Sequence, residues 1–281
     1  MDQGRARAAG LVRAGWIGTA AALAIGASAT AHTPFAVEVT EYIVGSGVNP
    51  AFTDSNSALG SPSRFTGIPA GFPSVVSPFS APFDNDQLVQ IGEGGSLTLR
   101  LGTRAWNDPS NPFGVDLIVF GNGSLIDTAF PNGVAGTPAA AFGLDPMVVE
   151  VSANGVDFIS LGTFTEGLFP TMGFQDGGPF DSTPGSVPTS FTTPVNPALT
   201  LADFSGLDMD GIRALYNGSG GGTPIDIAAS GLDFVDYIRI VNPLGSGITV
   251  EIDAVSVVPT PGGGVVIMLA GLACTARRRR A

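Results

Sequence analysis

The stretch Ser96-Leu97-Thr98-Leu99-Arg100-Leu101 alternates polar and apolar side chains over six residues. Successive side chains of a β-strand point to opposite faces of the sheet, so this pattern predicts a strand that buries one face. Farther along, Leu117-Ile118-Val119-Phe120 is apolar at every position. This second pattern is typical of a strand in the middle of a sheet whose two faces are both covered. Together the two stretches predict an all-β fold.

Similar strand signals recur between breaks rich in Gly, Pro, Asn and Asp. With the two strands at 96–101 and 115–120, they are found at 36–44, 87–91, 147–152, 158–164, 235–241 and 248–257. Asn154-Gly155 lies between two of these segments and predicts a hairpin. Eight strands in two sheets, with 40 Gly and 22 Pro to form the turns, predict a single β-sandwich of jelly-roll character.

The strand signal lapses between residues 162 and 230, where the chain is interrupted by prolines that include Pro179, Pro184, Pro188, Pro194 and Pro197. One short helix is expected at 207–216, with Leu207, Ile212 and Leu215 on one face and a stop at Asn217-Gly218. Long loops on a sandwich commonly carry binding sites, but crossovers between sheets also need length. The sequence leaves both interpretations open.

The N-terminal residues have the pattern of a secretory signal peptide. A basic region at 5–13 precedes an apolar core at 16–25, and small residues then allow cleavage after Ala29 or Ala31. We therefore expect residues 1–31 to be a signal peptide and residues 32–257 to form the exported ectodomain.

The C-terminal residues 258–281 form a second targeting pattern. Pro259 and Pro261 fix the backbone and Gly262 begins a glycine run, so neither a strand nor a helix can cross this junction. The uncharged segment 262–276 is shorter than the roughly twenty residues that a bilayer core requires, and four arginines follow it. The arginines are expected to stay in the cytoplasm, with everything before Val258 outside it.

This tail resembles the PEP-CTERM sorting signal of Gram-negative bacteria, with Thr260 where glutamate is commoner. The resemblance implies that an exosortase, a membrane-embedded cysteine protease, recognises Pro259, Thr260, Pro261 and Gly262 and removes the tail. The ectodomain would thus be tethered to the membrane before processing. It would then be released or re-anchored at the outer surface or in the extracellular matrix, while 262–276 makes a transient or permanent membrane contact.

The ectodomain also contains stretches similar to uncharacterised bacterial surface proteins that carry this tail. They are 57–60, 91–99, 112–121 and 149–155. At the level of the fold, the strand order is similar to galactose-binding-like jelly rolls, which include carbohydrate-binding modules with a structural calcium.

Charge and residue types exclude several functions. The ectodomain has 23 acidic residues against five arginines and no lysine, a formal charge of −18, which repels nucleic acid and attracts divalent cations. Its only histidine is His32, and the single cysteine, Cys274, lies in the tail. This excludes serine- or cysteine-type catalysis and disfavours zinc. Without disulfides, the ectodomain must depend on its core or on bound metal for stability.

Calcium fits this composition, because it is bound by carboxylate, amide and carbonyl oxygens. Glu251 and Asp253 are two residues apart on one strand, and the jelly-roll resemblance implies a partner acid on the first strand, Glu38 or Glu41. Asp116 and Asn122, at the two ends of the central strand, form a second candidate set. A structural calcium is thus the one cofactor that we expect.

The sequence predicts an exported structural or adhesion protein of the surface or matrix, without catalysis, whose partners are the secretion machinery and an exosortase. The alternative is a calcium-stabilised carbohydrate-binding module, in which Trp106 or residues of 164–191 stack on an exopolysaccharide or another glycan. The third is a glycoside hydrolase with paired carboxylates.

Overall fold

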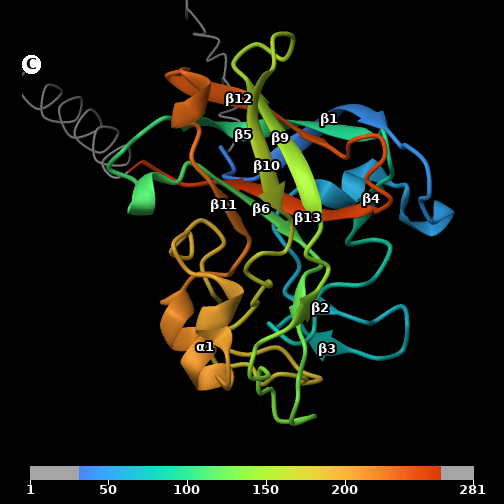
Figure 1. Cartoon of the computed structure of the whole chain (residues 1–281), viewed down its shortest axis with the longest axis vertical. Coiled ribbons are helices and arrows are strands. Elements are labelled where there is room, and N and C mark those ends of the chain that lie inside the picture. Colours follow the sequence, from blue (N-terminus) through green and yellow to red (C-terminus); the bar gives the residue numbers. More distant parts are fainter. Residues whose placement is uncertain (1–31, 261–281) are drawn as a thin grey trace, which may run out of the picture. The chain divides into compact units, whose positions relative to one another are not determined.

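The computed structural model describes residues 32–260, in which two antiparallel sheets pack face to face (Figure 1). The five-stranded sheet has the order β1 (Ala36–Ile43), β5 (Ser96–Trp106), β12 (Phe234–Val241), β9 (Pro146–Ser152), β10 (Ile159–Thr165). The four-stranded sheet has the order β11 (Thr223–Ile225), β6 (Leu117–Gly121), β13 (Val250–Val257), β4 (Val89–Ile91). The predicted signal peptide, and the sorting tail from Pro261 on, lie outside the described residues.

The strand order is that of a jelly roll with one added edge strand. When β1 is set aside, β5-β12-β9-β10 lies against β4-β13-β6-β11, so that neighbouring strands are mostly distant in sequence. All eight predicted strands are present and the all-β sandwich is confirmed. The ninth strand, β11, was missed because it is three residues long and contains Pro224. It lies at the edge of its sheet, where a proline can be accommodated.

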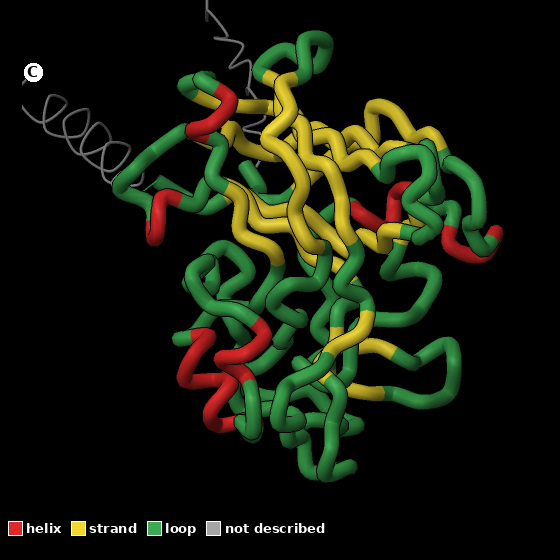
Figure 2. The backbone as a smooth tube through the Cα atoms, in the orientation of Figure 1, coloured by secondary structure: helices red, strands yellow, loops and turns green. Residues whose placement is uncertain are grey.

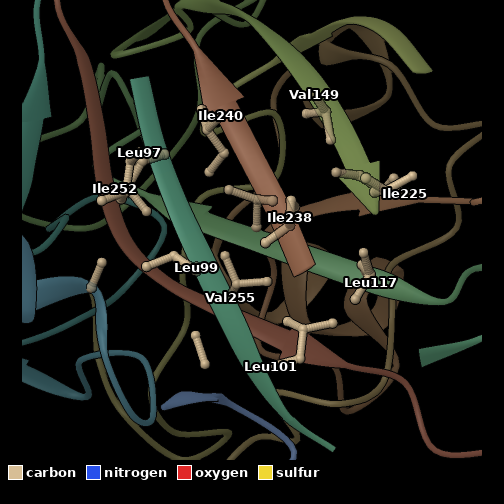
Figure 3. Packing of buried hydrophobic residues seen from close by; sticks show 14 of the residues in the cluster. Leu97, Leu99, Leu101, Leu117, Val149, Ile225, Ile238, Ile240, Ile252 and Val255 are labelled. Atoms are coloured by element: carbon tan, nitrogen blue, oxygen red, sulfur yellow. The ribbon is translucent and has the colours of Figure 1, made fainter. Parts of the chain in front are cut away.

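The alternation in β5 serves the main core. Leu97, Leu99 and Leu101 are buried and point into the space between the two sheets. Figure 3 shows Ile238 of β12 and Val255 of β13 in the same layer. Every one of these side chains is at most 4 % exposed. A shift of β5 by one residue would turn its leucines to the outer face of the sheet, so burial of these leucines fixes how β5 pairs with its neighbours.

Strand β6 is buried on both faces, as its apolar sequence predicts. Leu117 and Val119 belong to the main core. Ile118 and Phe120 face the other way, where Phe120 meets the ring of Phe191 with 5.3 Å between centroids. Phe191 comes from the long segment between β10 and β11. That segment therefore covers the outer face of the four-stranded sheet at this point.

The segment between β10 and β11 also builds a second core, which lies with α1 (Met209–Tyr216) in the lower half of Figures 1 and 2. The expected helix is confirmed: Asp208 caps it by accepting a hydrogen bond from the Gly211 amide at 2.9 Å, and it ends at Asn217, whose backbone is left-handed. Within residues 32–260, no helix is long and apolar enough to cross a bilayer.

Short elements complete the described chain. The 3₁₀ helices are η1 (Pro50–Phe52), η2 (Ser55–Ala58), η3 (Pro112–Gly114), η4 (Leu201–Phe204) and η5 (Ala228–Ser230). Two small hairpins pair β2 (Phe65–Thr66) with β3 (Ser74–Val75) and β7 (Ser124–Leu125) with β8 (Ala141–Phe142).

The predicted hairpin at Asn154-Gly155 joins β9 and β10. Its loop, residues 153–158, is longer than a two-residue turn. The Asn154 side chain holds this loop in shape. Asn154 Oδ1 accepts hydrogen bonds from the amides of Val156 and Asp157, both at 2.9 Å. Gly155 has a positive φ of 74°, which a glycine adopts without strain.

Candidate functional site

A buried acid, Glu166, lies where β10 ends. Its side chain is fully buried, and its backbone amide donates to the Asp145 carbonyl at 2.7 Å. Neither carboxylate oxygen has a hydrogen-bond partner among the described residues. The carboxylate lies against Gly121 of β6, where an added Cβ would come within 1.5 Å of Glu166 Oε1. Gly121 therefore makes the space that the carboxylate occupies.

Two of the predicted calcium ligands lie beside this acid. Asn122, directly after β6, donates from Nδ2 to Glu251 Oε2, and Gln90 Nε2 donates to Glu251 Oε1 at 2.7 Å. Asn122 Oδ1 is buried and, in the part of the chain that the structure describes, makes no hydrogen bond. We call Glu166, Glu251, Asn122 and Asp145 the acidic cluster.

The electrostatics of the acidic cluster follow from burial and from its own negative charges. Burial raises the pKa of Glu166 well above its usual range, and the carboxylates of Glu251 and Asp145 raise it further. The backbone amides of Asn122 and Gly123 lie close enough to lower this pKa, but neither meets the geometry of a hydrogen bond to Glu166. Burial also raises the pKa of Glu251, against the hydrogen bonds from Gln90 and Asn122.

Asp253 and Asp116, also predicted as ligands, have protein partners of their own. Asp253 accepts from the amide and hydroxyl of Ser63 at 2.8 and 2.9 Å. Asp116, at the other end of β6 from Asn122, accepts from Asn111 Nδ2 at 2.9 Å and from the Ile227 amide at 3.1 Å. These carboxylates therefore connect loops to strands within the fold.

The first-strand acids do not meet the last strand. Glu38 is exposed and pairs with Arg100 at 2.6 Å, and Glu41 is exposed as well. Strand β1 lies at the edge of the five-stranded sheet, whereas β13 lies in the other sheet. Of the six predicted ligands, the structure brings together Asn122 and Glu251 alone.

Sequence reasoning missed Glu166 and Asp145. No local pattern marks them, because they follow and precede ordinary strand segments. Within residues 32–260, no three His, Cys, Asp or Glu side chains form a ready metal-binding group. The three acids of the acidic cluster, Glu166, Glu251 and Asp145, therefore do not converge as one group of carboxylate ligands, and the side chain that contacts Glu251 is the amide of Asn122.

Trp106, the predicted sugar-stacking residue, borders a groove on the outer face of the five-stranded sheet. The groove has a volume of about 450 Å³ and is lined by His32, Arg100, Arg104, Trp106, Asp236 and Tyr237, with Leu101, Gly102 and Thr103. We call it the outer groove.

Trp106 is half exposed and held from two sides. The Phe234 ring meets it edge-on, with 5.4 Å between centroids. The Arg104 guanidinium lies 5.6 Å from the Trp106 ring and 3.6 Å from the Phe234 ring. Arg104 is itself fixed by two hydrogen bonds to Asp236, at 3.0 and 2.8 Å. The outer groove thus combines a rigid aromatic surface with fixed polar groups.

Comparison with known protein families, with curated proteins and with solved structures gives no match. The chain is therefore classified from its own structure, as a jelly-roll β-sandwich with a buried acidic cluster and an aromatic outer groove.

Proposed function

We propose that this chain is an exported β-sandwich that an exosortase sorts to the outer surface or extracellular matrix, where it serves in structure or adhesion without catalysis. The observation that supports sorting is where β13, the last strand of the described residues, ends, at Val257. Val258 is buried and its amide donates to the Asp116 carbonyl at 2.9 Å, whereas the next residue, Pro259, is exposed. Cleavage within the motif would therefore leave every strand of the sandwich intact.

Mass spectrometry of the mature C-terminus tests this proposal in a bacterial host that has an exosortase. We expect a terminus within 259–262 for the native chain and an uncut arginine tail for Pro261→Ala. Thr260→Glu, which restores the commoner motif residue, serves as the matched control and should be processed. An intact tail on the native chain and on Thr260→Glu would contradict the proposal.

The outer groove supports glycan binding as a second candidate function. Ligand sites in proteins combine apolar surface with a few fixed polar groups. Trp106 supplies an exposed ring, and Arg100, Arg104 and Asp236 line the same groove. This arrangement suits a sugar ring, whose apolar face can stack on indole while its hydroxyls reach charged groups at the groove edge.

Retention on immobilised polysaccharides, including the host's own exopolysaccharide, tests this second function. Trp106→Ala should weaken retention about tenfold or more, as is usual when a central aromatic contact is truncated. Phe72→Ala is the control, since Phe72 is 77 % exposed and lies outside the outer groove. Equal retention of the two variants, or no retention of the native chain on any polysaccharide, would refute glycan binding at the groove.

A further inference from the structure

Three buried side-chain oxygens in the acidic cluster lack hydrogen-bond partners among the described residues, which indicates a position for a ligand. Oε1 and Oε2 of Glu166 and Oδ1 of Asn122 have no hydrogen-bond donor among the residues described. A buried acceptor without a donor is costly, and a buried carboxylate without a compensating charge is costlier still. Such groups persist in a folded protein when something satisfies them. Among residues 32–260, the backbone amides of Asn122 and Gly123 approach Glu166 but form no hydrogen bond with it.

A proton satisfies this site incompletely. Protonated Glu166 would supply one donor to a site with three unsatisfied oxygens, and would leave the charge of Glu251 close by. A divalent cation bound between these side chains would offset the charge of both glutamates and could accept coordination from the unpartnered oxygens. Each Glu251 oxygen accepts one hydrogen bond and keeps a further lone pair for such a cation.

The donor chemistry selects the class of cation. The ligands are carboxylate and amide oxygens, which suit hard cations such as calcium, and His32, the only histidine, lies at the outer groove. Glu251 and Asn122 are only partly buried, so the acidic cluster borders solvent on their side, whereas Glu166 is fully buried.

We propose that Glu166, Glu251 and Asn122 Oδ1 form a binding site for a hard divalent cation of the calcium type, with Asp145 adding negative charge nearby. The site joins the end of β10 to the neighbouring strands β6 and β13. The cation would thus act as a cross-link in an ectodomain whose sequence has no cysteine.

Thermal unfolding and titration calorimetry of the full chain, purified in mild detergent and freed of metal with a chelator, test the site. Calcium chloride at a hundredfold excess over its Kd should raise Tm by about 5 °C or more. Magnesium chloride and manganese chloride are titrated in parallel to establish which hard cation binds best.

Glu166→Gln and Glu251→Gln should abolish both the Tm shift and the calorimetric heat. Glu41→Gln removes the same charge from an exposed position and should retain both. If a glutamate variant does not fold, Asn122→Ala replaces it, with at least a tenfold loss of affinity expected.

Two results would overturn the inference. The first is a native chain whose Tm responds to none of the three cations, with Glu166→Gln at least as stable, which would indicate a protonated glutamate. The second is a Tm shift that survives in both glutamate variants, which would place the cation elsewhere on the acidic surface. Neither result bears on sorting, which depends on residues 258–281.

Discussion

Replacement of Asp253 by asparagine should remove a large part of the pH dependence of stability. Asp253 is 3 % exposed and lies at an irregularity of β13, where Ser63 donates two hydrogen bonds to its carboxylate. Burial raises the pKa of Asp253 from 3.8 to about 7, in spite of these hydrogen bonds. The folded chain therefore holds this proton more tightly than the unfolded chain does.

The size of the effect follows from linkage between proton binding and folding. Because the pKa is higher in the folded state, the stabilisation is complete below pH 4 and is lost as the pH rises through 7. Each pH unit between the two values is worth about 1.4 kcal/mol, so the loss over the interval amounts to about 4 kcal/mol. Above pH 8 the contribution no longer changes.

Urea unfolding at pH 4, 5.5, 7 and 8.5 measures this contribution, with a chelator in every buffer so that cation binding does not contribute. Other buried acids titrate in both proteins and cancel in the difference. The free energy of unfolding of Asp253→Asn minus that of the native chain should increase by about 4 kcal/mol from pH 4 to pH 8.5. A difference that stays constant with pH, or that decreases, would refute the reasoning.

Further substitutions test the packing. Leu99→Ala should lower the free energy of unfolding by about 2–5 kcal/mol, since the side chain is fully buried; in the same urea experiment, exposed Val156→Ala should stay within about 0.5 kcal/mol. Gly121→Ala should cost about 1–3 kcal/mol by crowding both the Glu166 carboxylate and the Glu251 backbone carbonyl. Calorimetric melting should show that Gly121→Ala costs less when it is made in a Glu166→Ala background. If the effects of the two substitutions simply add, the contact between residue 121 and Glu166 is contradicted. Asp208→Ala should cost about 1 kcal/mol through the lost helix cap, whereas Asp208→Ser should retain most of the stability; equal losses would argue against capping.

Much of the fold could be predicted because its signals are local. A strand that buries one face alternates in sequence, as in Ser96–Leu101, and one that buries both faces is continuously apolar, as in Leu117–Phe120. Strand β11 and the short hairpins gave no such signal. Two or three residues are too few for a period, and their pairing depends on the strands beside them.

The candidate site was predictable only in part. Asn122 and Glu251 could be selected as oxygen ligands, but in two separate sets. Glu251 was expected to meet Glu38 or Glu41, which lie on the other sheet, and Asn122 was grouped with Asp116, which lies at the opposite end of β6. Glu166 has no distinguishing neighbours in sequence. Its importance comes from full burial and from two oxygens that lack a partner, and both are properties of the packed structure.

By itself, then, the sequence determined the all-β class, eight of the nine sandwich strands, the helix after Asp208 and the strongly acidic composition, because each of these is set by neighbouring residues or by counting. Only the tertiary structure decided which acids share a site. Asn122 and Glu251 are 129 residues apart and meet because β6 and β13 pair in one sheet. Glu166 joins them because the end of β10 passes over Gly121, whose missing side chain leaves room for a carboxylate.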